Sequence, residues 1–401
     1  MSHKRIIKKT GKILLYTLGS VFLLVCLLFL FINLPVGKRI VKNKVQSYLS
    51  GKLKTRVIIG SVNYSLPQWL EINGVYAEDQ KKDTLLFGEK ILADIDMVKL
   101  IWGNTDIEKI VFKNIFFNIS REEKDSAFNY QFVLDAFAGN KPAGKVDMDT
   151  AGLKLTLNRL VLDDVSLRFK DKNEGTDFYA RIKSLDASLN KFRPDRINFA
   201  IKDFTASGID FLMTTYKETK KDTVFIIPAD TIARPAYGLY ISAGTLDIRD
   251  ANVTVENKIS GMYYTNKVTH LALDNALFDL DRSLATGDYI LLDSSFVRFT
   301  NPKQTVVKTP AKDTTTYIPW MIKAKQVSFT NNIIQFDDNN LAKTDGFDAG
   351  HFNVKEFDAD ISEFMYSIER TAGMVKQLRF KDSSGLALDT LHVNFLMTDT
   401  I

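Results

Sequence analysis

The stretch "LNRLVLDDVSLRFKD", Leu157 to Asp171, decides the fold because its alternation of apolar residues changes phase at two aspartates. Apolar residues fall first on even and then on odd positions: Leu160 and Leu162, followed by Val165, Leu167 and Phe169. Because side chains of a β-strand alternate between its two faces, a straight strand would place these apolar halves on opposite faces. The stretch is therefore a damaged strand, a turn, or a kinked strand that keeps one apolar face continuous.

The same ten-residue pattern occurs in four other segments. Its first, third, eighth and tenth residues are apolar, its fifth residue is Asn or Asp, and the other positions hold residues of any kind. The five segments are "IVFKNIFFNI" (110–119), "LVLDDVSLRF" (160–169), "LDIRDANVTV" (246–255), "LALDNALFDL" (271–280) and "VSFTNNIIQF" (327–336), with Asn114, Asp164, Asp250, Asn275 and Asn331 at the fifth position. Their uneven spacing excludes a solenoid of fixed period. Asn and Asp tolerate turn-like backbone angles, so each segment is either a strand with a bulge that returns the later apolar residues to the same face, or a hairpin.

Most of the chain after Arg56 has strand-like alternation rich in Val, Ile, Phe, Thr and Tyr. This pattern predicts a mainly β fold, an elongated and curled antiparallel sheet that forms a groove, with a few short helices. The helical candidates are "DMVKLIW" (96–102) and "NYQFVLDAF" (129–137). Three stretches read as loops or excursions: "AGNKPAGKVDMDTAG" (138–152), "KETKKDTVFIIPADTIARP" (217–235) and "NPKQTVVKTPAKDTTTYIP" (301–319).

The N-terminus predicts a membrane anchor. Residues Ile13 to Leu34 contain no charge, and 22 helical residues span about 33 Å, enough for a bilayer core of about 30 Å. A cleaved signal peptide is the alternative, but the apolar run is longer than usual for one and no Ala-x-Ala pattern follows it. We therefore expect a basic cytoplasmic tail over 1–12, a single span over 13–34 and a translocated remainder.

The segment 35–54 predicts a basic amphipathic helix with Val41, Val45, Tyr48 and Leu53 near one face. Such a helix either lies among lipid headgroups or covers one end of a sheet, and one helix could do both. The candidates for headgroup contact are Lys38, Arg39, Lys42 and Lys44.

The net charge of +5 does not indicate a nucleic-acid partner. Residues 1 to 70 hold twelve Lys or Arg and no acid, so the 41 basic and 48 acidic residues that follow give a negative remainder. Four scattered histidines, one cysteine at Cys26 and the absence of a nucleophile elbow, P-loop or dinucleotide fingerprint leave no catalytic or metal constellation. We expect no enzyme activity and no cofactor. The acidic stretch "FDDNNLAKTDGFDAG" (336–350) lacks the spacing of an EF-hand and predicts a polar hairpin loop rather than a calcium site.

Several stretches resemble the N-terminal region of TamB and AsmA-like envelope proteins. They are residues 41–101, which include "YLSGKL" and "DTLLFG", and the segments "SAFNYQFVLDAF", "DGFDAGHFNVKEFDADI" and "LRFKDSSGLALDTLHVNF". Proteins of this family are anchored in the inner membrane by one N-terminal helix and extend a curled β-sheet with a hydrophobic groove into the periplasm. Full-length members are much longer, so the resemblance implies that the β-groove region over 55–401 continues beyond this chain. It also implies that the part contacting outer-membrane assembly proteins is absent here.

The resemblance implies that the chain carries phospholipid acyl chains between the inner and outer membranes. Its alternative is a scaffold for the assembly of outer-membrane proteins. From the residues alone, an apolar face of this kind more commonly forms the core of a closed barrel or sandwich; the resemblance favours an exposed groove. The groove candidates are Phe117, Ile119, Leu160, Leu162, Leu167, Phe169, Val253, Val255, Ile334 and Phe336.

Overall fold

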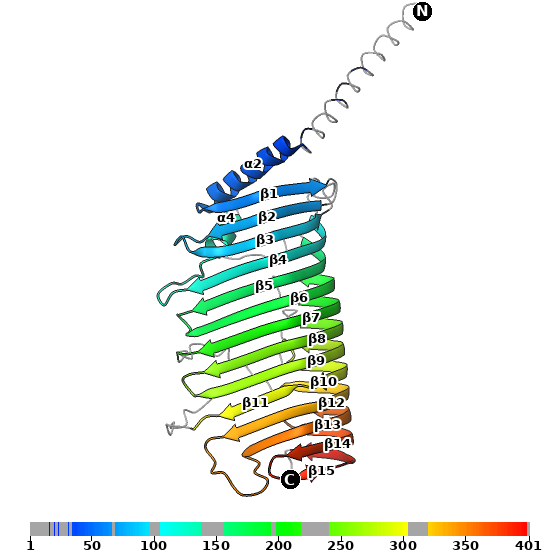
Figure 1. Ribbon diagram of the computed structural model, residues 1–401. Helices are drawn as coiled ribbons and strands as arrows, with labels where there is room; N and C mark the ends of the chain where they lie inside the picture. Colours follow the sequence, from blue (N-terminus) through cyan, green and yellow to red (C-terminus); the bar gives the residue numbers. More distant parts are fainter. Residues whose placement is uncertain are drawn as a thin grey trace, which may run out of the picture.

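The computed structural model describes residues 16, 20, 23, 31, 34–65, 69–95, 105–137, 155–193, 198–217, 240–303 and 320–398. They form one large mixed sheet of sixteen strands, together with helices α2 (Pro35–Leu53) and α4 (Gln131–Phe137) (Figure 1). The strands are β1 (Val57–Ser65), β2 (Trp69–Glu78), β3 (Thr84–Ile95), β4 (Thr105–Arg121), β5 (Leu155–Asp171), β6 (Thr176–Arg193), β7 (Asn198–Thr215), β8 (Tyr240–Asn257), β9 (Met262–Asp279), β10 (Leu284–Asp293), β11 (Phe296–Asn301), β12 (Met321–Asp338), β13 (His351–Tyr366), β14 (Arg370–Asp382), β15 (Ala387–Leu388) and β16 (Val393–Thr398).

The strands lie side by side in chain order from β1 to β14, as Figure 1 shows. Strands β10 and β11 are two halves of one position, because both pair with β9 on one side and β12 on the other. Strands β15 and β16 pair with different parts of β14. The sheet therefore grows by one strand at a time along a single axis.

The prediction of an antiparallel sheet is wrong at three places. Strand β4 is parallel to β5, β7 to β8, and the pair β10 and β11 to β12. Each of the three predicted excursions lies in the sequence between the two strands of one such pair. Parallel neighbours need a long crossover connection, whereas a short turn can only join antiparallel strands. The excursions thus mark the positions at which strand direction is retained.

The phase change that opens the sequence is a kink inside a continuous strand. Strand β5 passes through Asp164, whose φ is 53°. The φ of Asp250 is also 53°, and the three Asn positions of the pattern have φ between 48° and 50°. On β4 the rings of Phe112 and Phe117 contact each other at a centroid distance of 6.5 Å. Residues five apart on a regular strand point to opposite faces, so this contact shows that the later residues have returned to the first face. The prediction of one continuous face is confirmed, and the hairpin alternative is wrong.

The kink differs from a bulge in one respect. At a bulge, two residues on one strand face one residue on its neighbour. Here Lys113 pairs with Asp163 and Ile115 with Val165, so the kink residues Asn114 and Asp164 lie opposite each other and the register is kept. Strands β4 and β5 therefore kink in step and their later pairs stay aligned, whereas the register between β12 and β13 shifts on both sides of Asn332.

Kinks at aligned positions form a line across the sheet, which we call the crease. From β1 to β12 it runs through Gly60, Gly74, Glu89, Asn114, Asp164, Lys183, Gly208, Asp250, Thr269, Ser294 and Asn331. The left-handed φ angles fall on β2, β4, β5, β7, β8, β12 and the break between β10 and β11, all of which run in one direction. Asn275 belongs to a second, shorter line with Gly244 and Asp288.

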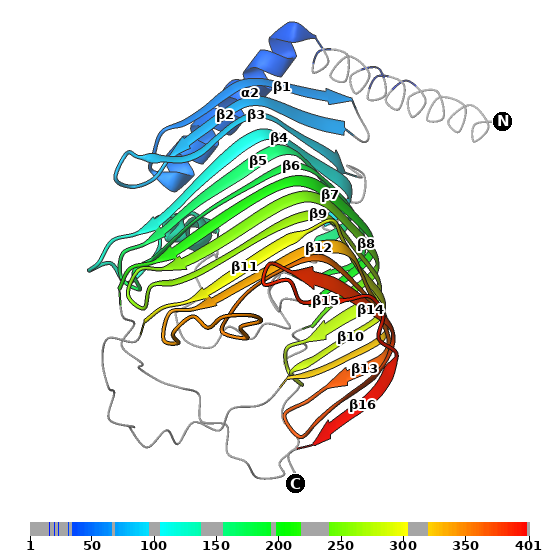
Figure 2. The same ribbon diagram turned by 60° about the horizontal axis from the view of Figure 1, so that its bottom comes forward.

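The sheet is curved into an open trough, seen obliquely from its C-terminal end in Figure 2. Helix α4 lies on the concave side, and α2 lies against the edge strand β1 (Figures 1 and 2). The backbone N–H of Ile59 donates to Gln46 Oε1 of α2 at 3.0 Å, and that of Val57 donates to Ser50 Oγ at 3.2 Å. An uncovered edge strand invites pairing with other chains. Helix α2 thus covers one end of the sheet, as one of the two alternatives predicted.

The predicted anchor over Ile13–Leu34 lies almost entirely outside the described residues, as does the helical candidate at 96–102. Within the described ranges, no helix combines the length and the apolar character needed to cross a membrane.

Candidate functional site on the concave face

Eight of the ten predicted groove residues fall into two rows that cross the sheet from β4 to β12. Register pairing gives one row as Phe117, Leu167, Ala180, Phe211, Val253, Asn266, Val297 and Ile334. It gives the other as Ile119, Phe169, Phe178, Met213, Val255, Tyr264, Phe299 and Phe336. We call these the Phe117 row and the Phe169 row. Paired residues in neighbouring strands point to the same face, so each row is a continuous apolar band apart from Asn266.

The remaining two residues, Leu160 and Leu162, lie on the same face across the crease. Both pack against the buried cluster of Leu185, Ala187 and Ala206. Ile182, three residues before Leu185, packs against the same cluster although a regular strand would direct it to the other face. Ile182 lies on the face of Phe178, which stacks on Phe169 at 4.6 Å between ring centroids. Leu160, Leu162 and Phe169 therefore share one face.

Aromatic rings line the Phe169 row. Beyond the contact of Phe169 with Phe178, the ring of Phe336 lies 5.9 Å from that of Phe299 and 5.5 Å from that of Phe352. Such ring contacts add about 0.5–1.5 kcal/mol each beyond the area they bury. The row is thus a semi-rigid apolar surface that its own ring contacts hold in place.

The concave face is not a closed core. All ten predicted groove residues are half-buried, whereas several fully buried apolar residues are alanines, such as Ala187, Ala206 and Ala251. Among the described residues, Ile115 is the only large apolar side chain less than 2% exposed. The described strands form an open sheet without a second sheet, so the closed barrel or sandwich interpretation is wrong for this part of the chain.

The concave face is covered at its N-terminal end. Phe132 and Val133 of α4 pack, together with Leu49 of α2, against a cluster that includes Val62 and Ile72 of β1 and β2. This arrangement closes the trough over β1 and β2. The sequence predicted a helix at this position but not the surface that it covers.

Asn129 fastens the segment that carries α4. Its backbone N–H donates to Ser120 O at 2.8 Å, and its side-chain oxygen accepts from Ser120 N–H at 2.9 Å. Its amide nitrogen donates to Asn118 O at 3.0 Å and to Oδ2 of the buried Asp79 at 3.1 Å. One side chain therefore joins this segment to the end of β4 and to the turn between β2 and β3.

An ion pair supports the same segment beside the Phe169 row. The guanidinium of Arg121 donates through Nε and Nη2 to the two oxygens of Asp171, at 2.9 and 2.5 Å, and lies 4.7 Å from the ring centre of Phe128. Burial alone would raise the pKa of Asp171, but hydrogen bonds from Arg121 and from the backbone N–H of Glu174 outweigh it and hold the pKa below its usual range. The ring of Phe128 in turn lies 5.3 Å from that of Phe169.

The four basic residues predicted to contact headgroups lie on α2. Arg39 and Lys44 are exposed, Lys38 and Lys42 are half-buried, and Lys38 Nζ lies 5.7 Å from the ring centre of Tyr64. The predicted apolar stripe is only partly right. Val45 and Leu53 pack on the sheet, but Tyr48 is 60% exposed. Val36 is also 60% exposed, and Ile40 is 45% exposed. The outward face of α2 therefore combines basic and apolar side chains.

The convex face carries charged pairs. Arg181 donates to both carboxylate oxygens of Asp164, at 2.7 and 2.9 Å, and these hydrogen bonds lower the pKa of that carboxyl group. The acidic stretch at 336–350 joins the antiparallel strands β12 and β13, as the hairpin prediction requires. In it, Asp348 accepts hydrogen bonds from the backbone N–H groups of Thr344 and Gly350, which accounts for its pKa below the usual range. The described residues contain no cluster of three or more His, Cys, Asp or Glu suited to a metal ion.

Half of the members of the two rows were missed by the sequence analysis. Phe178, Phe211, Phe299 and Tyr264 lie in segments without the Asn or Asp template, although their alternation with polar residues is visible. Pairing each candidate strand with its neighbour would have found them, but the register was not known.

Comparisons with known proteins do not place the chain in a family: no family model matches it, and no curated protein matches it. The resemblance to TamB and AsmA-like proteins therefore rests on the quoted stretches alone.

Proposed function

We propose that the chain is an inner-membrane-anchored, periplasmic carrier that holds phospholipid acyl chains on its concave face and passes them between the inner and outer membranes. The observation that carries this proposal is the pair of half-buried apolar rows that run from β4 to β12. Large contiguous apolar surfaces on proteins generally bind something. The TamB and AsmA-like resemblance supplies the membranes, the compartment and the phospholipid.

An acyl chain fits the rows energetically. Each methylene group removed from water contributes about 0.8 kcal/mol, so a chain of ordinary length gains several kcal/mol without any fixed polar contact. Because the rows cross strand after strand with similar side chains, a ligand can move along them without losing its surroundings. The rows therefore favour sliding over binding at one position.

Helices α2 and α4 restrict where a lipid enters. They cover the concave face over β1 and β2, so the accessible part of the rows begins at β4 and β5. The outward face of α2, with Arg39, Lys44, Val36 and Ile40, suits the headgroup region of the membrane. In this proposal α2 orients the sheet at the membrane and the lipid enters from the side of the trough.

Site-specific photocrosslinking in cells tests the proposal. Crosslinkers at Phe169, Val255 and Phe336 should capture phospholipid, which mass spectrometry of the purified adduct identifies. Crosslinkers at Asp164 and Arg168, which belong to the convex face, are the matched controls and should capture none. Equal capture at both sets would falsify the acyl-chain surface. A crosslinker at Ile72, beneath α4, should also stay empty.

The second candidate is a scaffold that offers strand edges to unfolded outer-membrane proteins. It is favoured by β16, where Leu396 and Met397 are 61% and 62% exposed on a strand that pairs with β14 along one side. Exposed apolar edge strands bind extended peptides by adding a strand. Crosslinkers on β16 that recover β-barrel precursors, together with no lipid on the Phe169 row, would favour this function over lipid transport.

A further inference from the structure

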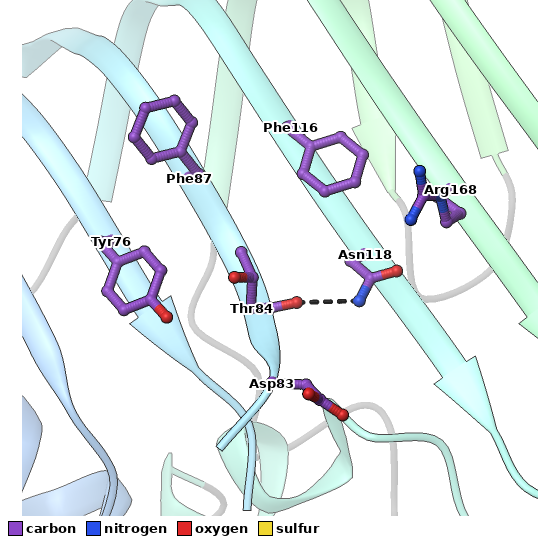
Figure 3. A pocket seen from close by; sticks show the side chains of 7 residues that line it. All are labelled: Tyr76, Asp83, Thr84, Phe87, Phe116, Asn118 and Arg168. Carbon is purple, nitrogen blue, oxygen red and sulfur yellow. Dashed lines mark hydrogen bonds between the residues drawn. The ribbon is translucent and has the colours of Figure 1, made fainter. Parts of the chain in front are cut away.

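A second surface lies on the convex face, opposite the two rows, over strands β2 to β5. It is a hollow of about 420 Å³, shown in Figure 3. Its lining is Tyr76, Asp83, Thr84, Phe87, Phe116, Asn118 and Arg168. Neither the crease nor the concave rows explain why aromatic residues gather there.

The aromatic residues form a short platform across three neighbouring strands. Tyr76 pairs in register with Phe87, and Phe87 with Phe116, so the three side chains point to the same face at strand spacings of about 4.8 Å. The same row continues beyond β4 with polar residues, first Ser166 and then Arg181. Phe87 is 56% exposed, which excludes a role in a core. An exposed aromatic platform within a polar face is a surface that binds a flat, partly apolar partner.

Arg168 supplies a positive charge at one end of the platform. Its guanidinium lies 5.6 Å from the ring centre of Phe116, and its side chain is exposed. Other arginines of the sheet, such as Arg159, Arg181 and Arg379, pair with aspartates. Among the described residues, no carboxylate forms an ion pair with Arg168. A guanidinium beside a ring, with no ion pair to the described carboxylates, suits a planar anion, to which it can donate two parallel hydrogen bonds.

The rim of the hollow carries both an amide and a carboxylate group. Asn118 Nδ2 donates to Thr84 O at 2.9 Å, which fixes the amide beside the platform, as Figure 3 shows. Asp83 places a carboxylate at the other side of the same opening (Figure 3). A partner with apolar faces, hydroxyl groups at its edges and one carboxylate would match the platform, the rim and Arg168 together.

We propose that the hollow binds an acidic saccharide, a pyranose chain that carries carboxylate groups. The C–H face of a sugar ring packs on Phe87 and its neighbours, a uronate carboxylate accepts hydrogen bonds from Arg168, and a hydroxyl group donates to Asp83. The site is independent of acyl-chain binding because it lies on the other face of the sheet. It gives the chain a contact with a soluble acidic glycan while the concave face remains available.

Isothermal titration calorimetry of the purified full-length chain with trigalacturonate and with neutral trigalactose tests this site. The acidic trimer should bind more tightly than the neutral one. Phe87→Ala should weaken binding of both about tenfold or more, because the packing surface is lost. Arg168→Gln should weaken binding of the acidic trimer about tenfold, which removes the preference for it, and should leave the affinity for the neutral trimer unchanged.

Two variants serve as matched controls. Arg298 also lies 5.6 Å from the centre of a phenylalanine ring, and Phe347 is also an exposed phenylalanine, at 47%, but neither lines the hollow. Arg298→Gln and Phe347→Ala should leave both affinities unchanged. Absence of binding at millimolar trimer, or equal weakening by the hollow variants and the controls, would overturn the proposal. Exposed residues are used throughout, so the variants should fold.

Discussion

Asp164 adopts a backbone angle that most residues avoid, and the continuity of the concave face depends on it. With φ at 53°, it reverses which face the following side chains occupy, so Leu167 and Phe169 rejoin Leu162. Asn, Asp and Gly reach this region at little cost, whereas a β-branched residue does not. At this scale the concave face depends on a permissive residue at each kink that has a positive φ.

Replacing Asp164 by valine should therefore destabilise the sheet although valine favours strands. We expect Asp164→Val to lower the free energy of unfolding by about 1–3 kcal/mol, from backbone strain at positive φ. Asp164→Gly should cost less because glycine keeps the angle. Urea unfolding monitored by circular dichroism measures both. Asp163→Val, one residue earlier and outside the left-handed region, is the control and should cost less than Asp164→Val; the reverse order would contradict the role of φ.

Asp171 makes stability depend on pH. Because its pKa is lowered in the folded state, its contribution is present above the unfolded pKa of about 4 and is lost as the pH falls through the lower folded value. Asp171→Asn leaves the half-buried Arg121 with only the more distant carboxylate of Glu174, at 3.6 Å, and should cost about 1–3 kcal/mol at pH 7. The difference from the unaltered chain should shrink below about pH 4, as urea midpoints at several pH values would show. A difference that stayed constant down to pH 2 would rule out the ion pair as its source.

Among the elements, helix α4 is visible in the sequence, but the strands that it covers are not. The segment "NYQFVLDAF" is a helical candidate in the sequence, and α4 occupies Gln131–Phe137. That it covers β1 and β2 follows from the fastening of Asn129, whose partners come from β4 and from the turn before β3. These long-range hydrogen bonds leave no periodic signal in the sequence.

Asn129→Ala should loosen this segment without unfolding the sheet. The variant leaves the carboxylate of Asp79 and the carbonyl of Asn118 without their amide partner, which costs about 1–3 kcal/mol for buried groups. Hydrogen exchange in residues 122–137 should become faster, while β6 and β7 keep their protection. Asn158→Ala, which removes an exposed amide bonded to Glu108, is the comparison and should leave the exchange of 122–137 unchanged. Unchanged exchange in the Asn129 variant would mean that apolar packing alone holds α4.

For the whole molecule, a sheet that grows one strand at a time behaves like a repeat protein. Each strand contacts mainly its neighbours, so stability is close to a sum of nearest-neighbour terms. A destabilising substitution at one end of the sheet should therefore lower the stability of the nearby strands and leave that of the distant strands unchanged.

Asn332→Ala tests this local behaviour. Its side chain is 1% exposed, accepts from Ser295 N–H at 2.9 Å and donates to Leu292 O at 2.8 Å, which joins the break between β10 and β11 to β12. Removing it should speed hydrogen exchange across β9 to β13 and leave β2 to β5 as they were. A uniform increase along the chain would show that the sheet unfolds as one cooperative unit.

The sequence predicted much of the concave surface but little of its layout. The ten groove residues share one face because alternation and the Asn or Asp positions are local properties of the chain. Gly74 and Gly208 were missed because the template required Asn or Asp, and Glu89 and Lys183 because they cross the crease with ordinary φ angles. The parallel pairs depend on register between strands separated by long connections, and the hollow around Phe87 depends on register across several strands, which no single segment encodes.

The crease also sets how this molecule can change its length. Because the strands from β1 to β12 cross the crease in register, a further strand of this kind adds about 4.8 Å to the axis and leaves the cross-section as it is. Fourteen strand positions give a reach of roughly 60 Å. In an inserted strand that did not kink, the side chains beyond the crease would point to the opposite face of the sheet. The length of such a sheet therefore changes in whole strands, and each added strand must cross the crease in register with its neighbours.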